Sequence, residues 1–306
     1  MSVKPDYPVE GADISSYQKQ MDFVIAEHRM SFLYIRAGSA YLPGDMKDSQ
    51  FDYNRRESYG KMPRGFYFVF RAEIPIEQQM EAFLQIMGSG LGELPPALDI
   101  ERNDLKLNPK TFTNRLIEAI GYLENSPQLH GEKVALYSSS GFWNANVQAG
   151  RINYEQRTLW VAHYHQNPKV TLPAPLLPRD WPYWTLWQLS ADDNGLGKEF
   201  GAQSYSIDID VFNGDQAGFT AWFGVPPNEP DPDSGPDDPT LNPPRYVVTR
   251  TNLNIRNGPG IAFKKIGSAL KNSRWPVMAV VRTADGLWVK VTEDVYIAYW
   301  LCEPVY

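Results

Sequence analysis

The chain has 306 residues, of which 42% are hydrophobic and 21% are charged. This composition is typical of a folded globular protein and excludes a disordered or fibrous one. The net charge of −7 is unevenly spread: residues 245–306 carry nine basic and four acidic side chains, a net charge of +5, whereas the rest of the chain is acidic. An acidic body with a mildly basic tail argues against nucleic-acid binding as the main role.

The first residues, MSVKPDYPVEGAD, contain no apolar segment of the kind that directs secretion, and no run of about 18 apolar residues occurs in the sequence. We therefore expect no membrane insertion. We also expect no signal peptide, which leaves release by cell lysis through a holin, or a trimmed secreted form. The single cysteine, Cys302, excludes an intrachain disulfide and is expected to be a small buried residue.

Short β-branched and aromatic runs recur through residues 1–225, and each predicts a strand. These runs are Gly11–Ile14, Phe32–Ala37, Gly65–Phe70, Ala97–Ile100, Val134–Ser138, Leu159–Tyr164, Thr185–Leu189 and Ser206–Ile209. The first five precede the predicted helices Asp22–Arg29, Asp52–Tyr59, Ile76–Met87, Thr111–Leu123 and Gly141–Val147. This α/β alternation predicts parallel pairing and a closed barrel of the TIM type, with several helices missing from its second half.

Residues 226–244 change abruptly in composition, with eight prolines and five acidic residues in PPNEPDPDSGPDDPTLNPP. Such a segment cannot bury a core and predicts an extended linker. It separates a domain of residues 1–225 from a smaller domain of residues 245–306. In the smaller domain, short apolar runs alternate with turn signals such as Asn257–Gly260, which predicts a small antiparallel all-β barrel.

Two carboxylates two residues apart lie at the end of one predicted strand, Asp99 and Glu101. Side chains at this spacing point to one face of a strand, with Cα atoms about 6.6 to 7 Å apart, so both can enter one pocket. Asp13 and Asp208 occupy comparable places on the first and last predicted strands. Crowding raises the pKa of one carboxyl among several, which provides a neutral general acid at neutral pH. Each acid alone reads as an ordinary strand-end residue, but the four together predict an active site.

Other catalytic chemistries lack their motifs. The histidines His28, His130, His163 and His165 have no metal-ligand spacing, and no glycine-rich phosphate loop or GxSxG nucleophile elbow is present. We therefore expect neither a metal nor another cofactor.

Aromatic side chains crowd the predicted strand ends, where their flat faces suit sugar rings, although barrel cores use aromatics too. They are Tyr17, Tyr67, Phe68, Tyr137, Trp160, Tyr164, Trp184 and Trp187.

A series of motifs in order gives the chain a resemblance to glycoside hydrolase family 25, the Chalaropsis-type lysozymes. They lie within residues 8–224 and include Gly11–Gln18, Ile35–Gly38, Gly65–Phe68, Leu98–Glu101, Leu136–Tyr137, Leu159–Tyr164, Trp187–Ser190 and Asp208–Gly214. The resemblance implies a TIM-like (β/α)5(β)3 barrel, in which five β/α units precede three strands. It also implies cleavage of the β-1,4 bond between N-acetylmuramic acid and N-acetylglucosamine in peptidoglycan.

The same resemblance implies roles for individual residues. Glu101 would be the general acid that protonates the leaving oxygen, and Asp99 would orient or stabilise the acetamido group of the substrate. Asp13 and Asp208 would shape the charge and hydrogen bonding of the pocket, and Tyr67 would hydrogen-bond the acetamido carbonyl. The other substrate-binding candidates are Tyr137, Trp160, Tyr164, Trp187 and Gln188. A carboxylate nucleophile and attack by the acetamido oxygen both stay open as routes, and the resemblance favours the second.

Asp210 stands where the closing motif of the family commonly has Asn, so an added negative charge beside Asp208 would raise the working pH unless Asp210 points outward. Residues 245–306, especially Leu253–Pro259 and Leu287–Val291, resemble the bacterial SH3-like domains of wall-lytic enzymes. That likeness implies a wall-binding module for peptide stems or cross-bridges.

Two rival functions are considered. One is a binding protein without catalytic activity, and the other is a glycosidase with a different substrate. A non-catalytic wall-binding protein would not need the carboxylates at Asp13, Asp99, Glu101 and Asp208, which are intact. A glycosidase for another N-acetylated polymer such as chitin would be expected to carry a DxxDxDxE run, which is missing. We therefore expect a monomeric enzyme whose partner is the glycan strand of peptidoglycan.

Overall fold

The computed structural model of the protein describes residues 7–88, 90–154, 157–164, 174–191, 195–223, 246–283 and 286–305. These residues form two compact units, one before and one after residue 232. The predicted linker 226–244 and His165 lie outside the described residues.

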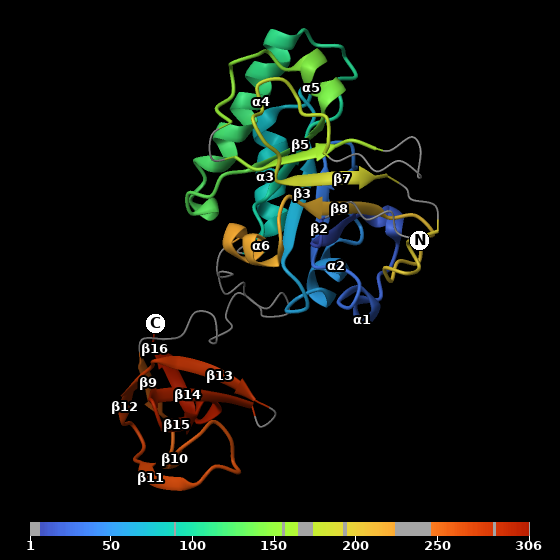
Figure 1. The fold of residues 1–306 in the computed structure, drawn as a ribbon. Helices are drawn as coiled ribbons and strands as arrows, with labels where there is room; N and C mark the ends of the chain where they lie inside the picture. Colours follow the sequence, from blue (N-terminus) through green and yellow to red (C-terminus); the bar gives the residue numbers. More distant parts are fainter. Residues whose placement is uncertain are drawn as a thin grey trace. The chain divides into compact units, whose positions relative to one another are not determined.

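The first unit is built on a closed barrel of eight strands in sequence order (Figure 1). The strands are β1 (Glu10–Ile14), β2 (Phe32–Ser39), β3 (Arg64–Val69), β4 (Ala97–Asp99), β5 (Ala135–Ser139), β6 (Leu159–Ala162), β7 (Leu186–Ser190) and β8 (Asp208–Phe212). All eight runs predicted from the sequence form strands, with ends shifted by up to three residues. The predicted closed barrel is thereby confirmed.

The pairing of the last strand corrects the expectation of parallel strands. Strands β1 to β7 pair in parallel, but β8 is antiparallel to both β7 and β1. A parallel partner requires a crossover, usually a helix, whereas an antiparallel partner needs only a loop. The described residues between β7 and β8 contain no helix. The first residue of β8, rather than its last, therefore lies at the end of the barrel where the other strands finish.

Five helices follow the first five strands: α1 (Phe23–Ala26), α2 (Phe51–Glu57), α3 (Ile76–Met87), α4 (Pro109–Glu124) and α5 (Ser140–Asn146). Their bounds match the predicted helices closely, except that α1 is shorter. Helix α4 begins where the Asn108 side chain accepts the backbone N–H of Thr111 at 3.0 Å, with Pro109 in the first turn. The buried faces of the helices meet the outward side chains of the strands, as where the ring of Phe83 lies 5.4 Å from that of Phe68.

A sixth helix, α6 (Gln216–Phe223), was not predicted, and it closes the other end of the barrel. Its buried Phe219 lies 5.3 Å from the ring of Phe32, which begins β2, and 5.3 Å from that of Phe212, which ends β8. Gly11 is required beside this cluster, because a Cβ there would come within 2.5 Å of the Phe32 ring. The open end of the barrel is therefore the one where β1 to β7 finish.

The second unit consists of short antiparallel strands in two sheets. Strands β10 (Leu253–Arg256), β11 (Lys265–Ala269), β13 (Ala279–Thr283), β14 (Gly286–Thr292) and β15 (Val295–Ala298) form one sheet, and β9 (Tyr246–Thr249), β12 (Arg274–Pro276) and β16 (Cys302–Val305) form the other. Its core includes Val247, Val289 and Ile297, and Cys302 is buried there as predicted. The all-β prediction is confirmed, and the SH3-like assignment stays a prediction.

Three short 3-10 helices complete the described elements, Ser16–Gln18, Pro127–Leu129 and Tyr299–Leu301. Among the described residues, none of the helices has the length and apolar character needed to cross a membrane.

Candidate active site

A cavity of about 470 Å³ opens at the end of the barrel where the parallel strands finish. The four predicted carboxylates all line it: Asp13 near the end of β1, Asp99 at the end of β4, Glu101 just beyond it, and Asp208 at the beginning of β8. The antiparallel direction of β8 brings Asp208 to this end. The spacing of Asp99 and Glu101 thus places both in one pocket, as the alternation of a strand predicts.

Two of these acids are buried and have unusual proton affinity. Asp13 is 5% exposed and Asp99 is 7% exposed. Burial raises the pKa of Asp13 well above its usual range, and the charges of Asp208 and Asp210 raise it further. Burial also raises the pKa of Asp99, and the charge of Glu101 adds to the effect. Buried and crowded carboxyls of this kind bind protons more tightly than exposed ones.

Glu101 lies at the accessible side of the cavity, within reach of an incoming ligand. The enclosing pocket raises the pKa of Glu101 by desolvation, and the neighbouring Arg102 guanidinium lowers it. The net rise is the property that a general acid needs at neutral pH. Next to it, Asp99 has one buried oxygen, Oδ1, without a hydrogen-bond partner among the described residues. That oxygen can accept an N–H group from a ligand.

A chain of hydrogen bonds fixes the orientation of Asp13. The Gln188 side chain on β7 donates from Nε2 to Asp13 Oδ2 at 2.5 Å. The Oε1 atom of Gln188 accepts from the hydroxyls of Tyr137 at 2.5 Å and Tyr164 at 2.7 Å. In this arrangement the oxygen of Gln188 faces the tyrosine hydroxyls and its N–H group faces Asp13. Asp13 therefore serves as an acceptor in this chain.

Five of the six predicted substrate-binding residues line the cavity, namely Tyr67, Tyr137, Trp160, Tyr164 and Gln188. Trp187 does not, which corrects the expectation. Strand residues alternate between the two faces, so Trp187 points away from the barrel interior when its neighbour Gln188 points inward. Trp187 is 1% exposed and packs 5.9 Å from the ring of Trp184 in the outer core.

The sequence did not single out Arg36, an arginine that lines this cavity. It lies on β2 within the Ile35–Gly38 motif, and a cation inside an apolar strand was the available signal. Arg36 donates to Asp48 Oδ2 at 2.7 Å and to Ser16 Oγ at 2.9 Å. Its positive charge lowers the pKa of Asp99 and so moderates the rise that burial causes. The remaining residues lining the cavity are Ser15, Tyr17, Gln18, Val69, Ala191, Ser204 and Ser206.

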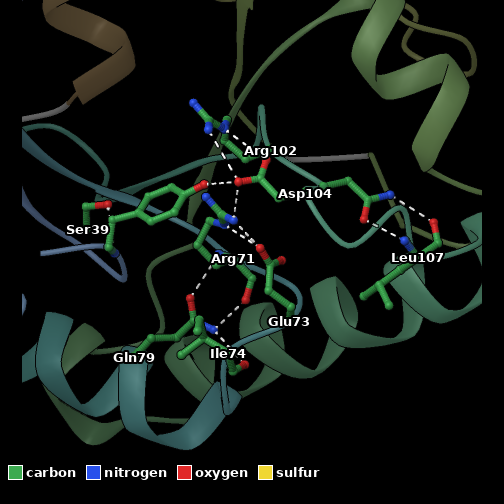
Figure 2. A network of polar contacts seen from close by, with 10 residues as sticks. Ser39, Arg71, Glu73, Ile74, Gln79, Arg102, Asp104 and Leu107 are labelled. Carbon is green, nitrogen blue, oxygen red and sulfur yellow. Dashed lines mark hydrogen bonds and ion pairs between the residues drawn. The ribbon is translucent and has the colours of Figure 1, made fainter.

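A second polar network joins the loops that follow β2, β3 and β4 (Figure 2). Arg71, after β3, donates to Glu73 at 2.8 Å and to Asp104, after β4, at 2.7 Å. Its guanidinium also lies 3.4 Å from the ring centre of Tyr41, after β2, and the Tyr41 hydroxyl donates to Asp104. Arg102 donates to the same carboxylate at 3.3 Å. We call Tyr41, Arg71, Glu73 and Asp104 the loop clamp.

The described residues contain no group of three or more histidine, cysteine, aspartate or glutamate side chains arranged to hold a metal ion. The described lining of the cavity offers carboxylates, tyrosine and serine hydroxyls, glutamine amides and the Arg36 guanidinium.

Comparison with known proteins agrees with this geometry. The sequence profile of Glycosyl hydrolases family 25 matches residues 12–197, which is more than half of the chain. The chain belongs to glycosyl hydrolases family 25. It is therefore a glycoside hydrolase, and the resemblance noted in the sequence is confirmed for this part of the chain.

Individual relatives extend the match. Lysozyme M1 of Streptomyces globisporus is 26% identical over 219 residues, which cover 68% of this chain and 69% of that protein. The structure of a family 25 glycosyl hydrolase from Bacillus anthracis has a TM-score of 0.58 at 25% identity and covers 72% of this chain and 96% of its own. The bacterial lysozyme of Streptomyces coelicolor has a similar fold, with a TM-score of 0.56 at 24% identity over 70% of this chain and 96% of its own.

Proposed function

We propose that the protein is a muramidase that cleaves the β-1,4 bond between N-acetylmuramic acid and N-acetylglucosamine, with Glu101 as the general acid. Membership of family 25 makes it a lysozyme-type hydrolase of peptidoglycan, a substrate of the bacterial cell wall. The observation that carries the proposed mechanism is the single cavity lined by Glu101, Asp99, Asp13 and Asp208.

Glu101 has two properties of a general acid. Solvent and substrate reach it, and the enclosing pocket raises its pKa, so that it keeps a proton to deliver to the departing glycosidic oxygen. Asp13 and Asp208 are farther along the cavity wall, on the strands β1 and β8 that pair with each other. We assign them to the charge balance and hydrogen bonding of the pocket.

Attack by the acetamido oxygen of the substrate is the route we favour. In this route Asp99 accepts the acetamido N–H through Oδ1, the buried oxygen without a partner among the described residues. Negative charge at Asp99 then supports the positive charge that develops on the substrate as its acetamido oxygen attacks the sugar. Tyr67, also on the cavity wall, is suited to donate to the acetamido group. A carboxylate nucleophile is the competing route.

For residues 245–306 we propose a wall-binding role. The unit has its own core and a net charge of +5, from nine basic and four acidic side chains. Positive charge favours contact with an anionic wall surface. Peptide stems and cross-bridges are the ligands that the SH3-like resemblance implies.

Reducing-end analysis tests the proposed activity. Purified peptidoglycan is digested with the full chain, the fragments are reduced, and mass spectrometry identifies the sugar at each new end. We expect N-acetylmuramic acid at the new ends. N-acetylglucosamine there would overturn the bond assignment, and an absence of new ends would favour the non-catalytic wall-binding rival. Release of soluble fragments from chitin tests the other rival, a glycosidase for that polymer.

A further inference from the structure

A second cavity, of about 560 Å³, lies in the barrel unit. Its wall comes from residues 150–154, which precede β6, and residues 180–183, which precede β7. The candidate active site opens where these strands finish, and the described linings of the two cavities share no residue. The second cavity is therefore a separate place on the barrel unit. Its lining includes Ile152, Tyr154, Asp180, Trp181, Pro182 and Tyr183.

Packed aromatic rings hold the wall of the second cavity in place. The rings of Tyr154 and Trp181 lie 4.7 Å apart, and Trp143 of α5 packs 6.3 Å from the first and 6.0 Å from the second. A hydrogen bond joins the two loops, because the Gly150 backbone N–H donates to Asp180 Oδ2 at 2.9 Å. Side chains that are already fixed lose little conformational freedom when a ligand arrives. The wall is thus preorganised for binding.

Two hydrogen-bond donors in this wall lack acceptors. The Trp181 indole nitrogen and the Tyr154 hydroxyl are buried and have no hydrogen-bond partner among the described residues. Trp143, which packs on both rings, carries an N–H donor and therefore cannot accept the Tyr154 O–H. Trp181 is 5% exposed and Tyr154 is 9% exposed. Because buried donors without acceptors cost free energy, a ligand that brings acceptor oxygens to this cavity would be stabilised.

The rest of the lining narrows the chemistry of that ligand. Ile152, Pro182 and the half-exposed ring of Tyr183 present apolar surface, which suits a molecule with an apolar face. Asp180 is the charged residue of the described lining, so its carboxylate disfavours an anion and can accept an N–H or O–H group. An N-acetylated sugar meets each requirement: it is neutral, one face of its ring consists of C–H groups, its acetamido carbonyl accepts, and its hydroxyls and acetamido N–H donate.

We propose that the second cavity is a non-catalytic binding site for an N-acetylated sugar of the peptidoglycan glycan strand. Trp181 and Tyr154 donate to oxygens of the sugar, and Tyr183 covers one face of its ring. The assignment to peptidoglycan rests on the proposed function, whereas the fit to an N-acetylated sugar rests on the lining. A second contact with an insoluble polymer keeps the enzyme near its substrate, because a chain held at one site is at a high effective concentration for the other.

Nuclear magnetic resonance of the full chain tests the sugar site. The indole N–H groups are labelled with nitrogen-15, Trp181→Phe identifies the Trp181 signal, and N-acetylglucosamine is the probe. We expect the Trp181 signal to shift in a saturable way, and we expect Tyr183→Ala to weaken the affinity by about 3- to 10-fold. Tyr59→Ala, at a half-exposed tyrosine that lines neither cavity, should leave the affinity unchanged. Glucose, which lacks the acetamido group, should bind more weakly.

Several outcomes of this titration would overturn the site. They are a Trp181 signal that stays in place up to the solubility limit of the sugar, equal affinity for glucose, and a shift caused by a D-alanyl-D-alanine peptide but not by the sugar. Tyr183 is partly exposed, so its replacement removes the contact without opening the core. A Trp181 shift in a protein without muramidase activity would contradict the proposed function but not the sugar site. Muramidase activity without the shift would contradict the sugar site alone.

Hydrolysis of insoluble walls tests what the site contributes. High ionic strength screens the charge of residues 245–306 but not a contact with a neutral sugar. Under these conditions we expect the full-length Tyr183→Ala protein to degrade insoluble peptidoglycan about 3- to 10-fold more slowly than the unmutated protein, with equal turnover of short soluble muropeptides. Tyr59→Ala should match the unmutated protein on both substrates. Equal rates of Tyr183→Ala and the unmutated protein on insoluble walls would overturn this contribution.

Discussion

At Glu101, two neighbouring influences act on one proton. Desolvation in the cavity raises its pKa and the Arg102 guanidinium lowers it. Arg102 is itself held by Asp104, which accepts its N–H at 3.3 Å. The acidity of the proposed general acid is thus set first by desolvation in the cavity and then by the charge of the residue next to it in the sequence.

Loss of the proton-transfer group should stop turnover. Glu101→Gln keeps the shape and a hydrogen-bond donor but has no transferable proton, so kcat should fall by about 10² to 10⁴-fold while binding of glycan chains changes little. Release of reducing ends from peptidoglycan measures the rate, and co-sedimentation with glycan measures binding. Asp99→Asn should also slow turnover, because it weakens support for positive charge on the sugar. Glu81→Gln on the exposed face of α3 is the control. A folded Glu101→Gln protein with near-normal activity would refute the assignment.

The pH dependence of the enzyme should respond to Arg102. Because its charge lowers the pKa of Glu101, Arg102→Gln should raise that pKa further. The protonated acid then persists to higher pH, so the alkaline limb of the kcat/KM profile should move to higher pH. Arg102→Lys keeps the positive charge and should leave the limb near its original place. Identical profiles for the two variants would show that charge at this position does not control the acid.

At the scale of elements, the loops after β2, β3 and β4 are joined through the loop clamp. Arg71 is 3% exposed, and it contacts Glu73, Asp104 and the face of Tyr41 at once. Its backbone is fixed as well, since the Gln79 side chain of α3 accepts its N–H at 3.0 Å and donates to its C=O at 2.8 Å. Figure 2 shows these contacts converging on Arg71 and Asp104. The loop that follows Asp99 and Glu101 is thereby tied to two other loops.

Breaking the clamp should destabilise the barrel unit. Arg71→Met removes the cation and leaves the buried Glu73 carboxylate without it, which should cost roughly 3 kcal/mol of unfolding free energy. Urea unfolding followed by tryptophan fluorescence gives this value. Arg56→Gln removes one partner of an exposed ion pair, Arg56 with Glu57, and should change stability by less than about 1 kcal/mol. Similar losses in both variants would mean that the clamp is no stronger than a surface pair.

The elements themselves were largely predictable, because strand and helix periods are local properties of the sequence. Helix Ile76–Met87 agrees with the prediction at both ends. The direction of β8 was not predictable from local pattern, since it depends on how the chain returns to the sheet. Helix α6 was missed because its eight residues include Gly218 and show no clear polar face.

Within the site, side chains that belong to a motif on a strand were found, and those that depend on tertiary contacts were not. The four carboxylates were proposed from strand position, and the five binding candidates that line the cavity from strand ends and from the family motifs. Arg36 was not proposed from the sequence, because its placement depends on a partner outside its own strand, Asp48. Trp187 does not line the cavity, because strand alternation turns its side chain to the face opposite that of Gln188.

At the scale of the whole molecule, two units of opposite charge each have a core of their own. Residues 1–225 carry 20 basic and 27 acidic side chains, a net charge of −7, whereas residues 245–306 have a net charge of +5. The cavity lined by Asp13, Asp99, Glu101 and Asp208 lies in the first unit, within the barrel. Separate cores allow one unit to be removed without exposing the interior of the other.

Removal of the second unit should therefore separate wall adhesion from catalysis. A shortened chain that ends near Val225 should hydrolyse soluble glycan chains at the rate of the full chain, because it keeps every residue of the cavity. On intact walls it should adhere less, since it lacks the basic unit, and the adhesion of the full chain should weaken as salt screens that charge. Sedimentation with purified walls at low and high ionic strength measures adhesion, and reducing-end release from soluble chains measures turnover. Equal adhesion with and without residues 245–306 would contradict the wall-binding role, and salt-independent adhesion of the full chain would instead favour an uncharged peptide ligand.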